Sequence, residues 1–157
     1  MNVTLLLIGK TAENYLQTGI DIYVDRLQHY TRFSIEVVPA LRDVRNATPA
    51  EVKLKEGQLL LKHMAKADRV VLLDERGRSY TSVGFAERLQ QHMNGGVRHL
   101  MFVVGGAYGF SPDVYQAASE RMSLSTLTFN HQMVRLFFVE QLYRAFTILR
   151  NEKYHNE

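Results

Sequence analysis

The chain of 157 residues has no cysteine, only three prolines and ten glycines. Without cysteine it cannot form a disulfide, a thiolate zinc site, an iron–sulfur site or a cysteine nucleophile. Hydrophobic residues make up 46% of the chain and charged residues 22%, a composition that excludes disordered and collagen-like proteins. We expect one folded domain over residues 1–157, in the reducing cytoplasm.

Long apolar runs and blocks of like charge are also missing. The apolar run from Val3 to Ile8 is far too short to span a membrane and has no charged leader, so we expect a first strand and no membrane partner. The formal net charge is +3, and no run of five or six like charges occurs. A slight excess of cations favours an anionic partner, but charge alone does not identify RNA.

Strand and helix patterns alternate along the chain. Apolar runs of strand length predict strands over residues 3–8, 33–38, 69–74, 99–104 and 122–125. Helical spacing, with Thr48, Ser82 and Ser111 as caps, predicts helices over residues 15–30, 49–64, 83–94, 112–118 and 131–150. Unbroken apolar strands are typical of a parallel sheet covered on both faces, so we expect an α/β fold with ligands at the carboxyl ends of the strands.

Three loops at that edge carry candidate ligand contacts. The turn at residues 105–109 (GGAYG) lets backbone N–H groups approach a ligand, although it matches no phosphate fingerprint and a purely structural turn explains it equally well. Residues 123–129 interleave hydroxyl and apolar side chains, which suits an adenine; the alternative is an edge strand that caps the last helix. Residues 74–76 are ligand contacts or solvated turn residues.

The last predicted helix is unusually apolar, with twelve apolar residues among the seventeen from Met133 to Leu149. A homodimer contact would cover its second side, and the alternative is a central helix covered within one chain. Glu140, Arg144 and Thr147 form its polar stripe, in which the first two fit an exposed i,i+4 pair. On composition alone the tail at residues 153–156 is a frayed end. The histidines show no metal-ligand spacing, so we expect no metal site.

A set of short motifs occurs in order along the whole chain. They are Gly9-Lys10, Lys55-Glu56-Gly57, Leu72-Leu73-Asp74 with Gly77, Val104-Gly105-Gly106-x-x-Gly109, Leu124-Ser125-x-x-Thr128-Phe129-x-His131-Gln132, Arg135, Glu140-Gln141-x-Tyr143-Arg144-Ala145 and Tyr154-His155. Together they resemble the ribosomal RNA large subunit methyltransferase H family. The resemblance implies a SPOUT-type α/β fold, a parallel sheet flanked by helices with a C-terminal trefoil knot, although general topology rules exclude knots.

The resemblance further implies a homodimer that transfers a methyl group from S-adenosylmethionine to N3 of a pseudouridine in 23S rRNA, within the assembled ribosome and without a metal. The implied cofactor contacts are Leu73, Gly105, Leu124, Ser125, Thr126, Leu127, Thr128 and Phe129. The implied catalytic positions are Arg144, Tyr154 and His155: Arg144 for a phosphate or developing charge, Tyr154 for stacking, and His155 for proton transfer.

Two residues depart from the family pattern: Asn130 replaces the usual proline, and Asn156 the usual arginine or lysine. The first is expected to loosen the cofactor loop, and the second removes a phosphate contact. Two alternative functions stay open. A non-catalytic ribosome-binding module would bind RNA without S-adenosylmethionine, and a small nucleotide-binding α/β oxidoreductase would need fingerprint glycines that are missing here.

Overall fold

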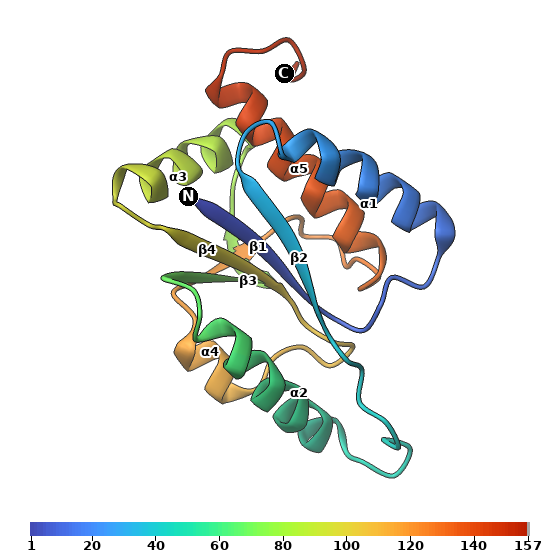
Figure 1. The fold of residues 1–157 in the computed structure, drawn as a ribbon. Helices are drawn as coiled ribbons and strands as arrows, with labels where there is room; N and C mark the ends of the chain where they lie inside the picture. The colour runs from blue at the N-terminus through green and yellow to red at the C-terminus, as the bar shows by residue number, and fades with distance from the viewer. Residues whose placement is uncertain (157) are drawn as a thin grey trace.

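The computed structural model describes residues 1–156, in which strands and helices alternate (Figure 1). The strands are β1 (Asn2–Ile8), β2 (Arg32–Val38), β3 (Arg69–Ser79), β4 (His99–Val104) and β5 (Glu120–Ser123). The helices are α1 (Asn14–Leu27), α2 (Pro49–Met64), α3 (Ser82–Asn94), α4 (Pro112–Ala117) and α5 (Met133–Leu149). No helix in this part of the chain is both long and apolar enough to cross a membrane.

The five strands form one parallel sheet in the order β2-β1-β4-β3-β5. Helices α1, α3 and α5 cover one face, and α2 and α4 cover the other (Figure 1). All strands therefore end at the same edge, which we call the carboxyl edge. The predicted α/β fold, a parallel sheet flanked by helices, is confirmed.

The central strand β1 shows why the apolar runs are unbroken. Leu5 and Leu7 pack into the layer of α1, α3 and α5, whereas Leu6 packs into the layer of α2 and α4. Successive side chains of a strand point to opposite faces, so a strand with helices on both sides needs apolar residues at every position.

Capping residues set the helix starts, with one correction. Thr48 caps α2 as predicted, and its hydroxyl accepts a hydrogen bond from Glu51 N at 3.2 Å. The prediction that Ser82 caps α3 is wrong. Thr81 is the cap, and its hydroxyl accepts from Gly84 N at 3.0 Å.

Strand β3 continues five residues beyond Asp74, where the prediction ended it, and β5 begins two residues earlier than predicted. The pairing between them shifts register from Leu73 to Arg78, so residues 74–77 have no partner in β5. A Cβ at Gly77 would lie 2.5 Å from Met122 N, so only glycine permits this approach. The bulge places Asp74 and Glu75 at the carboxyl edge.

Helix α5 packs against α1 and α3 and spans Met133–Leu149, slightly shorter than predicted. Its predicted polar stripe is wrong at Thr147, which is fully buried and donates its hydroxyl to Arg144 O at 2.6 Å. The alternative of a helix covered entirely within one chain is also wrong, because Met133 and Phe137 are 40% and 42% exposed.

Candidate functional site

A cavity of about 220 Å³ lies at the carboxyl edge, where β3 and β4 end. We call it the edge cavity. Seven of the eight predicted cofactor residues line it: Leu73, Gly105, Leu124, Ser125, Leu127, Thr128 and Phe129. The eighth, Thr126, lies exposed on the same loop and is not part of the lining. The structure thus brings residues from three separate loops around one space.

The glycine turn after β4 forms one wall of the edge cavity, and packing explains two of its glycines. A Cβ at Gly105 would lie 3.1 Å from the Phe110 ring, and one at Gly106 would lie 2.6 Å from both carboxylate oxygens of Glu56. Gly109 has a φ of +84°, a backbone conformation that other residues rarely adopt. The glycines are needed for the turn, and the same turn lines the cavity.

Helix α2 supports this turn from behind, a role that the sequence analysis missed. The Glu56 carboxyl group packs on Gly106, and burial raises its pKa. Its Oε1 is buried without a hydrogen-bond partner among residues 1–156. The next residue, Gly57, packs closely on the side chain of Ser111, the residue that caps α4. Helix α2 therefore contacts both the turn and the start of the helix that follows it.

The segment between β5 and α5 forms the opposite wall. Ser123 donates its hydroxyl to Ser125 O at 2.8 Å, and Ser125 Oγ accepts from Leu127 N at 3.0 Å. Thr128 donates to Glu75 Oε2 at 3.2 Å, which joins this segment to the end of β3. Side-chain hydroxyls therefore fold the loop while its apolar side chains face the cavity.

The expectation that Asn130 loosens this loop finds no support in the local geometry. Its Oδ1 accepts from Gln132 N at 2.7 Å, an Asx turn that sets the direction of the chain before α5. Phe129, directly before it, packs its ring 4.9 Å from the ring of Phe137. The hydrogen bond of Asn130 thus fixes the turn at this position, where a proline would restrict the backbone through its ring.

The charged residues around the edge cavity are mainly acidic. Its lining includes Asp74, Glu75 and His131 but, among the described residues, no lysine or arginine. Tyr115 donates its hydroxyl to Asp74 Oδ2 at 2.6 Å, and burial together with this bond raises the pKa of Tyr115 to about 12. Tyr115 therefore stays protonated at neutral pH and donates its hydrogen bond to Asp74. Carboxylates predominate in the lining itself, and the Arg121 guanidinium lies 4.3 Å from the centre of the Tyr115 ring.

The start of α5 is fixed to the end of β1 by Arg135, which is almost fully buried. Its guanidinium donates to Ile8 O at 2.8 Å, Gly9 O at 2.9 Å and Thr11 Oγ1 at 3.1 Å. Ile8 is the last residue of β1 and Gly9 follows it, so Arg135 holds the cavity-lining end of α5 against the sheet. The sequence motif contained this arginine, but only the structure gives its role.

The three predicted catalytic residues meet beside the middle of α5, around Glu140. Glu140 Oε1 accepts from Arg144 Nη2 at 2.7 Å and from the Tyr154 hydroxyl at 2.9 Å. Arg144 Nη1 also donates to His155 Nδ1 at 3.1 Å, which places the imidazole proton on Nε2. We call Glu140, Arg144, Tyr154 and His155 the tail cluster.

Two sequence-based interpretations of this region are wrong. The Glu140–Arg144 pair is mostly shielded, with side chains 18% and 23% exposed, because the tail folds back over it. The tail is also no frayed end: Tyr154 contacts the Tyr143 ring at 4.8 Å and the Tyr23 hydroxyl at 3.3 Å. Burial and these hydrogen bonds raise the pKa of Tyr154, so its hydroxyl stays a donor to Glu140.

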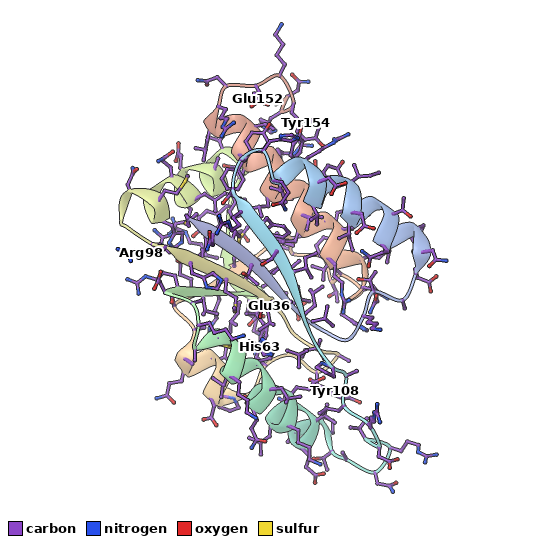
Figure 2. All side chains as sticks on the ribbon, viewed as in Figure 1. Glu36, His63, Arg98, Tyr108, Glu152 and Tyr154 are labelled. Atoms are coloured by element: carbon purple, nitrogen blue, oxygen red, sulfur yellow. The ribbon has the colours of Figure 1, made fainter. Side chains whose placement is uncertain are left out.

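The edge cavity and the tail cluster are separated within one chain. Val134 lines the cavity, and Arg144 lies ten residues further along α5, a distance of about 15 Å at the rise of an α-helix. Tyr154, labelled in Figure 2, contacts Glu140 and Tyr143 from the tail that folds back over α5. The structure therefore places the predicted cofactor residues and the predicted catalytic residues in two groups and does not join them.

No group of three or more metal-ligating side chains occurs in residues 1–156. The chain matches a family model described as "Predicted SPOUT methyltransferase" over residues 1–155. The chain therefore belongs to the SPOUT methyltransferase family.

Named relatives identify a narrower group. Ribosomal RNA large subunit methyltransferase H of Flavobacterium johnsoniae is 52% identical over 157 residues, covering 100% of both chains. The proteins of the same name from Christiangramia forsetii and Parabacteroides distasonis are 52% and 50% identical, over 99% and 100% of both chains. The family resemblance stated from the sequence motifs is confirmed.

A solved structure supports the fold. The probable methylase family protein of Haemophilus influenzae aligns with a TM-score of 0.56, at 12% identity, over 97% of this chain and 67% of that one. At this identity the likeness concerns the fold alone.

Proposed function

We propose that this chain transfers a methyl group from S-adenosylmethionine to N3 of a pseudouridine in 23S rRNA, within the assembled ribosome. The observation that carries the proposal is the convergence of seven expected cofactor residues on one cavity in a chain about 50% identical to named rRNA methyltransferases. The C-terminal trefoil knot and the single-domain organisation belong to the same proposal.

The edge cavity suits this methyl donor by shape and charge. Its apolar walls at Leu73, Leu124 and Leu127 fit an adenine, and the glycine turn exposes backbone to the rest of the ligand. S-adenosylmethionine, when bound, supplies a methyl group activated by a positively charged sulfur. The carboxylates of Asp74 and Glu75 favour such a cation over a neutral ligand.

The tail cluster suits the nucleobase. N3 of the target base must lose its proton, to solvent in this arrangement, before it can attack the methyl group and displace the sulfur, so negative charge develops on the ring and its carbonyl oxygens. Arg144 is a cation held in place by Glu140, so it is positioned to stabilise that charge, and the Nδ1 of His155 accepts from Arg144. The Nε2 of His155 is buried, so in this arrangement His155 holds Arg144, and Tyr154 provides a ring for stacking.

A homodimer would bring the two groups together. Tyr15 and Ile22 on α1 and Met133 and Phe137 on α5 are exposed apolar side chains. Gly19, on the same face of α1 as the first two, contacts Leu136 of α5, so these residues form one apolar surface. Phe137 also contacts Phe129 of the cofactor loop, which places that surface beside the edge cavity. We infer that a partner's tail completes each site.

Mixed dimers test this arrangement. We combine an Arg144→Ala chain, defective in the tail, with a Gly105→Val chain, defective in the cavity. If the sites are shared between chains, random mixing restores about a quarter of the wild-type activity, because half of the dimers contain one intact site. If each chain completes its own site, the mixture stays inactive.

Calorimetric titration with S-adenosylmethionine, with S-adenosylhomocysteine and NAD as controls, tests the function itself. We expect micromolar binding of the methyl donor, loss of binding in Gly105→Val, and methyl transfer to ribosomes that lack the modification. Binding of NAD instead would favour the oxidoreductase. A folded dimer that binds ribosomes but neither adenosyl ligand would favour the ribosome-binding module.

A further inference from the structure

The edge of the sheet opposite the edge cavity carries a row of cations. Arg32 and Arg69 are the first residues of β2 and β3, and Arg98 directly precedes β4. The register places them along one edge: Arg98 and Arg69 lie at the starts of the adjacent strands β4 and β3, whereas β1, whose Asn2 pairs with both Arg32 and His99, lies between Arg32 and Arg98. Neighbouring strands lie about 4.8 Å apart, so the arginines follow one another along this edge.

These side chains are free to contact a partner. Arg32, Arg69 and Arg98 are exposed, as is Lys66 in the loop before β3, and none of the four makes a side-chain hydrogen bond or ion pair with another residue in 1–156. Figure 2 shows Arg98 pointing outward from the sheet. We call these four residues the basic edge.

Two carboxylates also lie at this edge, and both have structural partners. Asp68 Oδ2 accepts from the backbone N–H groups of Arg98 and His99 at 2.9 and 2.8 Å. These bonds lower the pKa of Asp68 and fix the backbone from which Arg98 projects. Glu120, the first residue of β5, forms an ion pair with Arg88 at 2.7 Å, so the four cations of the basic edge keep an excess of positive charge.

The basic edge is continuous with the tail. The Tyr30 hydroxyl donates to Glu152 Oε2 at 2.6 Å, and the Arg150 guanidinium lies 4.6 Å from the centre of the Tyr30 ring. Thr31, the residue just before Arg32, donates to Met1 O at 2.6 Å. A chain of contacts thus joins the tail to the first cation of the edge.

We propose that the basic edge binds the phosphate backbone of the rRNA that flanks the target nucleotide. This inference rests on the proposed function, which places the target base at the tail cluster. Phosphates follow one another along an RNA strand, as the cations do along this edge, and no side-chain hydrogen bond or ion pair within the described residues occupies these cations. Such contacts hold the RNA in position without reading its sequence.

The test compares two double variants that remove the same charge. Arg69→Gln with Arg98→Gln alters the basic edge, whereas Arg42→Gln with Arg45→Gln alters the exposed loop between β2 and α2. Arg45 has only a 3.8 Å pair with Asp43, whose side chains are about 90% exposed, so neither control position holds the fold. Binding to unmodified ribosomes and to naked 23S rRNA is measured at several salt concentrations, with calorimetry for S-adenosylmethionine.

For the basic-edge variant we expect the slope of log affinity against log salt to fall by about 1.5 on both RNA probes. Its KM for ribosomes should rise about tenfold, with unchanged affinity for the methyl donor. The loop variant should match the wild type. Equal losses in both variants, or an unchanged slope, would overturn the proposal.

A loss on ribosomes with an unchanged slope on naked rRNA would also overturn it, because the edge would then contact a ribosomal protein. Failure of the proposed function has a different signature. In that case the wild-type chain neither binds the methyl donor nor methylates ribosomes. The salt dependence of RNA binding by the two variants still tests whether the basic edge binds RNA.

Discussion

Glu140 and Arg144, one turn apart on α5, form an ion pair with a 2.7 Å contact that the chain's own tail shields from solvent. The same Glu140 oxygen accepts the Tyr154 hydroxyl, and the other oxygen accepts from Gln141 Nε2 at 2.8 Å. One carboxylate therefore fixes two of the three residues that we place at the target base. Glu140 touches neither ligand in this arrangement, so it is a positioning residue.

Glu140→Gln should lower kcat for ribosome methylation about tenfold or more, because it removes charge-assisted hydrogen bonds to Arg144 and Tyr154. The affinity for S-adenosylmethionine should not change, since Glu140 and the other residues of the tail cluster are not part of the cavity lining. Single-turnover methylation and calorimetry measure the two quantities. The exposed Glu87→Gln on α3 is the control, and a matching loss there, or a weaker cofactor affinity without a kcat effect, would contradict this role.

Glu75→Gln should reduce the preference of the edge cavity for a charged ligand. Glu75 lines the cavity and accepts a hydrogen bond from Thr128 on the opposite wall. A carboxylate near a positively charged sulfur raises the affinity for that ligand about fivefold. We expect weaker binding of S-adenosylmethionine and unchanged binding of S-adenosylhomocysteine, whose sulfur carries no charge. Parallel calorimetric titrations decide the matter. Equal weakening for both ligands would show a steric effect instead.

Much of the fold was predictable because its signals are local. The run at residues 3–8 is apolar at every position but one since helices cover both faces of β1, and Thr48-Pro49 marks the start of α2 by its own chemistry. Two errors had physical causes. Thr81 and Ser82 are both hydroxyl residues that can cap, and the polar stretch after Asp74 becomes strand only because Gly77 admits β5.

The site was predictable only in part. The cofactor loops follow strands of a parallel sheet, so topology alone brings them to one edge. The tail was different. Tyr23 and Tyr143 are far apart in the chain, and only the packing of α1 on α5 puts them around Tyr154. Similarly, Glu56 reaches Gly106 through the packing of α2 on the sheet, which no local pattern reveals.

The apolar surface of α1 and α5 predicts a dimer that a single charge disrupts. Ile22→Glu, at a side chain 46% exposed on α1, should weaken self-association about thirtyfold or more, because it places a charge in an apolar contact. Methylation should fall with it, whereas cofactor binding should persist. Sedimentation velocity measures the association. Leu54→Glu on α2, at a similarly exposed apolar residue, is the control, and a monomeric wild type would refute the interface.

The raised pKa of Glu56 predicts a stability effect that depends on pH. Burial raises this pKa above the ordinary 4.5, so the folded chain binds the proton more tightly than the unfolded chain. The protonated group favours folding at low pH. That contribution is lost as the pH rises from 4.5 through the folded-state pKa, above which a buried carboxylate faces Gly106.

Glu56→Gln keeps the shape of the side chain but cannot ionise. It should therefore raise the melting temperature relative to wild type at pH 8, and the difference should shrink toward zero near pH 4.5. Thermal unfolding at the two pH values measures this, with the exposed Glu87→Gln inside α3 as the matched change. A difference that is equal at both pH values would mean that the introduced amide acts by packing, and a lower melting temperature at pH 8 would mean that the ionised carboxylate stabilises the turn.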